Sequence, residues 1–228
     1  CLHRDHLSIC GISSMPKVFG YLIQTELRAL DAIIKNPDKK TLAIIGGGKM
    51  DDKMELLKNM CKKVDTIYVC GGNTNSLLKK KMGDYLKEIS SYRSRIVLVE
   101  DGLCARNLSE FPCLKDISFL GEDEFFYDIG MKSIGTLQKL IQEHEVIFWN
   151  GTLGVVEDVK YKKGSELCVQ FLHTAMRANP YIQVIVGGGD TGGFVDQYAH
   201  GFTHISSGGG ASIEYITFDT LVGLKQFE

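Results

Sequence analysis

The stretch VIVGGGDTGGF, residues 184–194, decides the fold, because it sets an apolar run directly before five glycines, an aspartate and a threonine. A second cluster, HISSGGGAS at residues 204–212, follows another apolar run. Glycine inside a regular element costs roughly 0.5–1 kcal/mol relative to alanine. We therefore expect both places to need bare backbone, as a chain does where it turns sharply or approaches a ligand.

Apolar runs of this kind recur along the chain, with helical patterns between them. The predicted strands are residues 41–45, 66–70, 95–99, 145–149, 182–186 and 202–206. The predicted helices are residues 50–63, a segment ending near residue 89, residues 131–143, residues 161–178, and one helix after each of the two clusters above. The strand runs do not alternate with polar residues, which is typical of strands covered on both faces. The sequence therefore predicts a doubly wound, Rossmann-like α/β fold with a six-stranded parallel sheet and helices on both faces.

Two further segments stand outside this alternation. Residues 14–36 carry apolar side chains at the helical period between Ser-Pro and Asn-Pro signals, which predicts one long helix. Residues 100–130 show no such period, and we expect a long irregular segment that covers the ligand-binding edge of the sheet.

The glycine clusters follow predicted strands, at the edge where open α/β sheets bind ligands. Bare backbone amides and the positive end of a following helix together form an anion site, and phosphate is its common occupant. The alternative interpretation is that these glycines only form tight turns. The presence of several glycine clusters on one edge of the sheet disfavours it. The sequence thus indicates a phosphate-binding edge.

The stretch GGGKMDDK, residues 46–53, adds two lysines to one of these clusters. Lys49 and Lys53 lie four residues apart near the amino end of a predicted helix, where cations are disfavoured and like charges repel. An anion bound between them reverses both penalties, whereas the alternative is a solvated pair. Asp190 is the best candidate for a Mg²⁺ ligand, a role compatible with capping a helix.

None of three common nucleotide-binding motif sets fits the sequence in full. The P-loop pattern fails, because Ala43 stands where its first glycine is required. Gly187, Gly189 and Gly192 satisfy GxGxxG, but the next predicted strand ends without the acidic residue that a nicotinamide-binding fold needs, which disfavours an oxidoreductase. The protein-kinase motif set is also missing: DFG does not occur, and HRD at residues 3–5 lacks the rest of its catalytic-loop pattern, since Cys10 stands where that pattern requires asparagine.

Composition excludes several classes of protein. The net charge of −2 over 228 residues gives no reason to expect nucleic acid or a membrane surface as a partner. The seven cysteines form no CxxC motif and three of their spacings are nine residues, which we interpret as coincidence. This pattern favours a reduced, cytoplasmic compartment. The first residues lack a signal-peptide pattern and an initiator methionine, so we expect a processed chain or a piece of a longer protein.

Four motifs, taken in their order along the chain, resemble those of a known family. IIGGGKMDDKM at 44–54, VIFWNGTLGVVE at 146–157, and the clusters beginning at Val184 and His204 resemble the nucleotide-binding half of phosphoglycerate kinase. HRDH at 3–6 resembles the end of that family's phosphoglycerate-binding domain. The resemblance implies three parts: a remnant of that domain at 1–13, an interdomain helix at 14–36 and a nucleotide-binding domain at 37–228.

The resemblance also assigns nucleotide-binding residues. The matching positions are Gly47, Lys49, Lys53, Gly71, Gly130, Asn150, Val155, Glu157, Gly188, Gly189, Asp190 and Thr191. It implies that Lys49 is a catalytic residue, which stays in contact with the phosphoryl group during transfer. It also implies that Lys53 is a second phosphate contact. Asn150 and the Thr191 hydroxyl lie on the phosphate side, and Glu157 holds the ribose. Three glycines are implied to line the adenine slot: Gly47, Gly71 and Gly130.

The remaining implied roles concern the transfer itself. The backbone amides of Gly209 and Gly210 are implied to be catalytic, since they steady the phosphoryl group in transit. Asp190 is the implied Mg²⁺ ligand, and Arg4 belongs to the basic patch that grips 3-phosphoglycerate. The implied reaction is glycolytic phosphoryl transfer between 1,3-bisphosphoglycerate with ADP and 3-phosphoglycerate with ATP, by an intact protein that is a monomer.

The resemblance covers only about the second half of a family member, so we expect this chain to bind a magnesium nucleotide without transferring phosphate. Two departures bear on nucleotide affinity: Asn73, Thr74 and Asn75 replace a largely apolar stretch, and Thr152 replaces a proline. They keep open an alternative, a diverged nucleotide-binding module without kinase activity.

Overall fold

The computed structural model describes residues 2–11, 16–36, 38–48, 54–75, 95–198 and 201–227. Within these ranges all six predicted strands are present, and they form one six-stranded parallel sheet. The strands are β1 (Thr41–Ile45), β2 (Thr66–Val69), β3 (Arg95–Leu98), β7 (Val146–Asn150), β8 (Gln183–Gly187) and β9 (His204–Ser206). Their order in the sheet is β3-β2-β1-β7-β8-β9, so β1 and β7 lie at the centre and the predicted fold class is confirmed.

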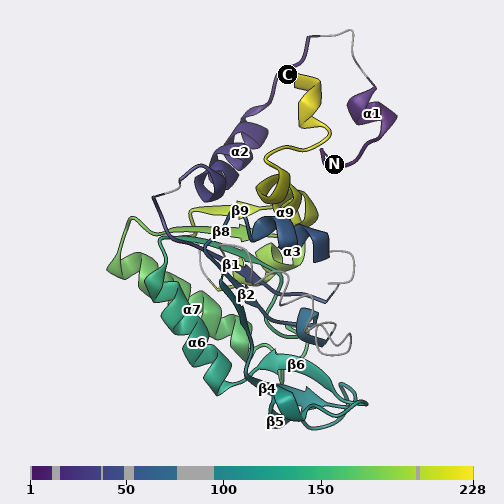
Figure 1. Cartoon of the computed structure of the whole chain (residues 1–228), viewed down its shortest axis with the longest axis vertical. Coiled ribbons are helices and arrows are strands. Elements are labelled where there is room, and N and C mark those ends of the chain that lie inside the picture. Colours follow the sequence, from purple (N-terminus) through teal and green to yellow (C-terminus); the bar gives the residue numbers. More distant parts are fainter. Residues whose placement is uncertain are drawn as a thin grey trace.

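Helices cover both faces of this sheet. One face carries α6 (Met131–Glu143), α7 (Lys163–Ala178) and α8 (Gly189–Val195), and the other carries α2 (Tyr21–Ile34), α3 (Met54–Met60) and α9 (Gly209–Phe218). Figure 1 shows α6 and α7 side by side under the sheet and α2, α3 and α9 above it.

Successive β1 residues explain these two layers. Leu42 and Ile44 are buried in the cluster with α6 and α7, whereas Ala43 and Ile45 are buried in the cluster with α2, α3 and α9. Both faces of the strand are therefore apolar, because side chains alternate between them.

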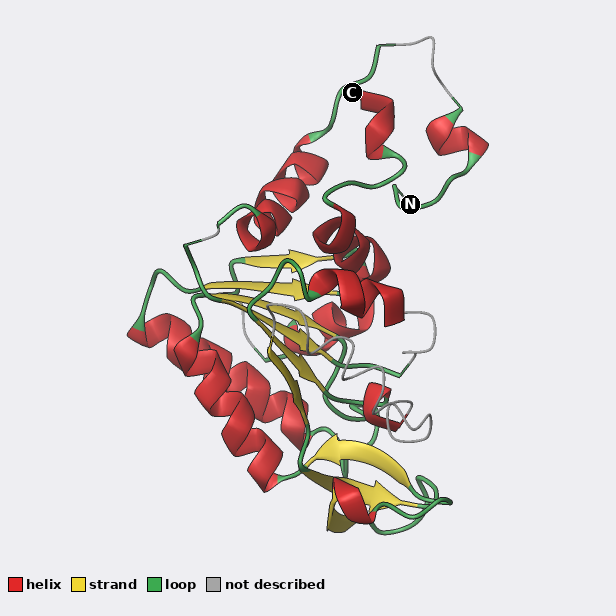
Figure 2. Cartoon of the chain, in the orientation of Figure 1, coloured by secondary structure: helices red, strands yellow, loops and turns green. Residues whose placement is uncertain are grey.

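The segment 100–130 is not irregular, contrary to expectation. It holds β4 (Asp101–Ala105), β5 (Cys113–Asp116), the 3-10 helix η1 (Ile117–Phe119) and β6 (Phe125–Ile129). The three strands form a small antiparallel sheet in the order β5-β4-β6, visible below the large sheet in Figure 2. Its strands mix charged and apolar residues, and no residue of β5 is fully buried. This pattern is weaker than the apolar runs of the parallel sheet, whose strands are covered on both faces.

The first long helix is shorter than predicted, because α2 begins at Tyr21 rather than Ser14. Residues 16–20 are not helical. Phe19 stacks on Phe227 with ring centroids 4.0 Å apart, and the Lys17 ammonium donates to the Gln226 carbonyl at 3.2 Å. Contacts with the C-terminal 3-10 helix η2 (Leu224–Phe227) thus replace the helical ones.

Other predicted boundaries agree closely or lie outside the described residues. The short helix α1 (Leu7–Cys10) precedes residues 12–15, which are not described. Most of the predicted helix ending near residue 89 also lies outside, and only a helical turn at 73–75 is described. The division into three parts at residues 13 and 36 stays a prediction.

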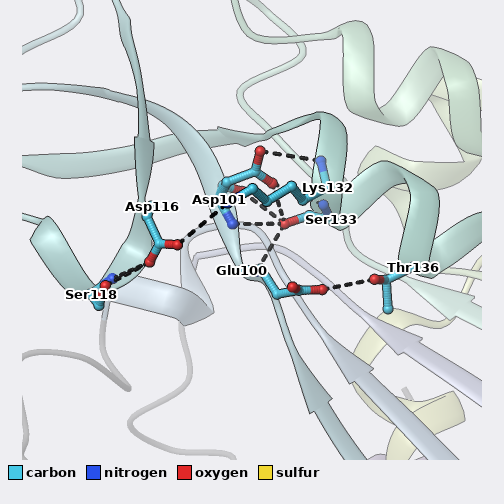
Figure 3. A network of polar contacts seen from close by, with 7 residues as sticks. All are labelled: Glu100, Asp101, Asp116, Ser118, Lys132, Ser133 and Thr136. Atoms are coloured by element: carbon cyan, nitrogen blue, oxygen red, sulfur yellow. Dashed lines mark hydrogen bonds and ion pairs between the residues drawn. The ribbon is translucent and has the colours of Figure 1, made fainter.

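The amino end of α6 is capped by a residue from the small sheet. Gly130, its N-cap, has no side chain, and the Asp101 carboxylate accepts the N–H groups of Lys132 at 3.2 Å and Ser133 at 2.8 Å. The Ser133 hydroxyl donates to the same carboxylate at 2.8 Å (Figure 3). A Cβ atom at Gly130 would lie 2.4 Å from the Asp101 Cγ, so the cap requires glycine there. Asp101 therefore joins β4 to α6.

Removing this cap should destabilise the protein. We expect Asp101→Ala to lower the free energy of unfolding by about 3 kcal/mol, because the N–H groups and hydroxyl that it satisfies are left without their charged acceptor. Urea unfolding followed by circular dichroism measures the change. Glu100→Ala is the matched control, since the exposed Glu100 side chain contacts only the Thr136 hydroxyl among the interactions drawn in Figure 3, and its backbone N–H bond to Ser133 is kept in the variant. It should cost less than about 0.5 kcal/mol. Equal losses in the two variants would contradict the assigned cap.

Candidate functional site

The loops that follow β1, β2 and β7 meet at the carboxyl edge of the parallel sheet. The Gly46 N–H donates to the Asn150 carbonyl at 2.8 Å, and the Gly47 N–H donates to the Thr152 carbonyl at 2.9 Å. The Asn73 N–H in turn donates to the Gly47 carbonyl at 2.8 Å. Three loops from distant parts of the sequence are therefore hydrogen-bonded backbone to backbone.

Glycine is required in these loops by their close approach. A Cβ atom at Gly46 would lie 2.3 Å from the Thr152 carbonyl oxygen, and one at Gly71 would lie 2.7 Å from the Gly47 nitrogen. Gly71 and Gly151 also have positive φ angles of 64° and 89°. At these positions, tight packing of loops accounts for the glycines without a ligand.

A cavity of about 250 Å³ lies beside these loops. Its lining consists of Gly47, Gly48, Gly72, Asn75, residues 125–127, Thr152, Gly154 and Val155. The wall formed by residues 125–127 of β6 was not predicted, because the segment was expected to be irregular. The apolar run in FFYDI before Gly130 is the signal that identifies it. The small sheet thus contributes one side of the candidate site.

The two asparagines at 73 and 75 have structural partners. The Asn75 amide donates to the Phe126 carbonyl at 2.9 Å and accepts the Phe126 N–H at 2.8 Å, as a neighbouring strand would. The Asn73 amide donates to the Gly46 carbonyl at 2.7 Å. These side chains hold the β2 loop against β6 and the β1 loop.

The two glycine clusters of residues 184–212 also meet at this edge. The Asn150 amide donates to the Gly209 carbonyl at 3.2 Å, and the Gly151 N–H donates to the Thr191 hydroxyl at 2.9 Å. A Cβ atom at Gly209 would lie only 3.1 Å from the Cα atom of Gly188, whose φ is 100°. Asn150 and Thr191 are buried. The loops after β7, β8 and β9 are thereby joined, and α8 and α9 both begin there.

The predicted site residues are distributed unevenly over this edge. Gly47 and Val155 line the cavity. Asp190 and Glu157 are exposed, Asp190 in the first turn of α8 and Glu157 in the loop after β7. Apart from the chain neighbours and the backbone of the same helix, no described atom lies within 4 Å of a Cβ placed at Gly189 or at Gly210, which leaves space there for a ligand.

Four further predicted residues are not assigned to the cavity. Lys49 and Lys53 lie outside the described residues. Gly130 contacts the Asp101 carboxylate and is not among the residues that line the cavity. Arg4 is exposed in the N-terminal segment, which is held where the Gly223 N–H donates to the Leu2 carbonyl at 2.7 Å. Their binding roles stay predictions.

A buried carboxylate lies next to the cavity wall. Asp128 in β6 is fully buried and accepts the N–H groups of Gly164 and Ile129, each at 2.9 Å. Burial raises the pKa of Asp128 to about 7, although these two N–H groups act in the opposite direction. A Cβ atom at Gly154 would lie 2.4 Å from one oxygen of this carboxylate. The charge of Asp128 is thus sensitive to pH near neutrality.

Neither a metal cluster nor a membrane helix is found in the described part of the chain. There, no three His, Cys, Asp or Glu side chains are grouped so that they could hold a metal ion. No described helix is both long and apolar enough to cross a membrane.

The fold and this edge define a doubly wound α/β protein whose glycine loops converge at the carboxyl ends of its strands. The family profile described as "Phosphoglycerate kinase" matches residues 1–218. The chain therefore belongs to the phosphoglycerate kinase family, and the resemblance predicted from its motifs is confirmed.

Individual relatives agree with this assignment. The chain is 32% identical over 241 residues to a phosphoglycerate kinase of Coprothermobacter proteolyticus, covering 97% of this chain and 60% of the relative. It is also 32% identical over 240 residues to one of Staphylococcus saprophyticus, with the same coverage. The structure of phosphoglycerate kinase from Coxiella burnetii has a TM-score of 0.85 and 26% identity, covering all of this chain and 63% of that one. The chain thus spans about 60% of the length of the curated relatives that it matches.

Proposed function

We propose that the chain is the nucleotide-binding half of a phosphoglycerate kinase. In the proposed reaction a phosphoryl group passes between 1,3-bisphosphoglycerate with ADP and 3-phosphoglycerate with ATP, as part of glycolysis in the cytoplasm. The observation that carries the proposal is the contact between Gly188 and Gly209, which brings two glycine loops and two helix starts to one edge. Backbone amides at helix starts favour phosphate.

The proposed roles follow from this arrangement. ADP or ATP lies with its base beside the cavity wall of residues 125–127 and its phosphates toward Gly189 and Gly209. Asn150 and Thr191 hold the loops that carry these amides, as their hydrogen bonds support. Phosphoryl transfer depends mainly on positioning and charge neutralisation, which lysines and oriented amides supply.

A Mg²⁺ site at Asp190 fits the residues present. The Asp190 carboxylate is exposed in the first turn of α8, next to the space at Gly189. A single carboxylate with waters and nucleotide phosphates is a common environment for Mg²⁺. When bound, the ion neutralises phosphate charge, while Asp190 orients it from the start of the helix.

We infer that residues 1–228 bind a magnesium nucleotide but do not transfer phosphate by themselves. Arg4 alone among the predicted site residues belongs to the acid-substrate side, and it is exposed in the N-terminal segment. The second candidate, a nucleotide-binding module without kinase activity, is favoured by the structural use of Asn73 and Asn75. Conversion of 1,3-bisphosphoglycerate by the intact protein separates the two candidates.

Calorimetry with ADP and Mg²⁺ tests the nucleotide site. We expect Lys49→Ala to weaken ADP binding about 10-fold to 100-fold, since a charge-assisted contact is worth roughly 1.5–3 kcal/mol. Asp190→Ala should weaken binding in Mg²⁺ but leave it unchanged in EDTA. Lys132→Ala on α6 is the matched control, because Lys132 is exposed and is not predicted to contact nucleotide. A wild-type chain that releases no heat with ADP would overturn both candidates.

A further inference from the structure

Two cysteines face each other across the small sheet. Cys104 in β4 is the direct partner of Cys113 in β5, and both thiols are reduced in this structure. Opposite residues of antiparallel strands point to the same face. The nine-residue spacing of this pair, which we interpreted as coincidence, therefore has a structural basis here.

The ladder geometry sets the distance between these two residues. The Ile117 N–H donates to the Glu100 carbonyl at 2.9 Å, which makes these two residues a hydrogen-bonded pair. Hydrogen-bonded and non-hydrogen-bonded pairs alternate along an antiparallel ladder, so the pair four residues further along is again hydrogen-bonded. Cys104 and Cys113 are therefore a hydrogen-bonded pair with Cα atoms about 5.5 Å apart, a spacing common in disulfides. Their Cβ atoms must approach to about 4 Å, which β5 permits as the edge strand.

The two thiols differ in accessibility. Cys113 is exposed on the edge strand, whereas Cys104 is 1% exposed in the core and its burial raises the pKa of its thiol to about 11. A small oxidant in solution therefore meets Cys113 first, and Cys104 is positioned to attack second.

We infer that Cys104 and Cys113 form a reversible disulfide by exchange with a low-molecular-weight disulfide. The Cys113 thiolate attacks one sulfur of the small disulfide, whose S–S bond breaks and releases one thiol after protonation by water. The Cys104 thiolate then attacks Cys113 in the mixed disulfide, forming the protein S–S bond and releasing the second thiol. Two protein thiols lose two electrons in total, and one small disulfide is reduced to two thiols.

The position of the pair links this modification to the cavity. β4 lies between β5 and β6, and Cys104 is also in register with Phe126 on β6. Phe126 lines the cavity. The disulfide fastens the edge strand to the sheet that forms the cavity wall. Because its Cβ atoms must be drawn together, the bond is readily reduced.

Peptide mapping after treatment with oxidised glutathione tests the inference. Trypsin cleaves after Arg106, between the two cysteines, so the peptides 96–106 and 107–115 remain joined only by the disulfide. We expect most of peptide 107–115 to be recovered in the joined form, and dithiothreitol to separate the two. The oxidised protein should melt at a Tm roughly 5 °C higher than the reduced protein.

Variants make the outcome decisive. Cys113→Ser, a change at an exposed site, should abolish both the joined peptides and the Tm shift, whereas Cys10→Ser should change neither. Cys104→Ala should accumulate glutathione on Cys113. Wild-type protein that carries glutathione on Cys113 but yields no joined peptides, or that joins Cys113 to a different cysteine, would overturn the inference.

Discussion

Gly46→Ala is expected to destabilise the protein by about 5 kcal/mol, through backbone overlap and the loss of inter-loop hydrogen bonds. The added methyl group would lie 2.3 Å from the Thr152 carbonyl oxygen and 2.4 Å from that of Gly151. Both are backbone atoms, so no side-chain rotation relieves the contact. The Gly46 N–H to Asn150 bond, which ties β1 to the β7 loop, lengthens as the loops separate.

Gly48→Ala is the matched control for this change, two residues along the same loop. Apart from its two chain neighbours, no described residue has an atom within 4 Å of a Cβ atom placed at Gly48. We expect urea midpoints close to the wild-type value for Gly48→Ala and strongly lowered for Gly46→Ala. If the two variants unfold at the same urea concentration, the contact between the loops does not determine stability.

Asp128 should make stability depend on pH in an unusual direction for a carboxylate. Its pKa is raised from 3.8 to about 7 in the folded chain, so the folded state holds a proton between these values that the unfolded state has released. The stabilisation from the neutral form is fully present below pH 4 and is lost as pH rises through 7. At 1.36 kcal/mol per pKa unit, the loss is about 4 kcal/mol.

Comparison with Asp128→Asn isolates this contribution, because the amide does not titrate. Urea unfolding at pH 4.5, 6 and 8 should show wild-type protein losing stability relative to the variant as pH rises, with most of the change complete by pH 8. If the free energies of unfolding of the two proteins change equally with pH over this range, the pKa of Asp128 is not raised. That result would indicate that the N–H groups of Gly164 and Ile129 lower this pKa by more than burial raises it.

The sequence predicted the parallel sheet well because its strands are buried on both faces. Runs such as TLAII at 41–45 place every residue in the core, so a continuous apolar run is physically required. The site edge followed from the same pattern, since parallel strands end together and the glycine clusters stand directly after them. The contact between Gly188 and Gly209 agrees with that expectation.

Other features depend on contacts that local sequence does not encode. The start of α2 is set by the stacking of Phe19 on Phe227, more than two hundred residues away in sequence. The small sheet was missed because Asp101 and Asp128 interrupt its apolar runs, and both are buried to accept helix N–H groups. The role of Gly46 depends on the path of the β7 loop.

The N-terminal segment packs against the C-terminal segment, through contacts of residues 2, 17 and 19 with residues 223, 226 and 227. These contacts affect where the chain can be divided into structural units. The first and last segments, which lie together in Figure 1, form one discontinuous substructure that neither segment can build by itself. Boundaries drawn along the sequence therefore cut through this substructure. A truncation at either end removes the support of the other, so expression boundaries should be chosen for both ends jointly.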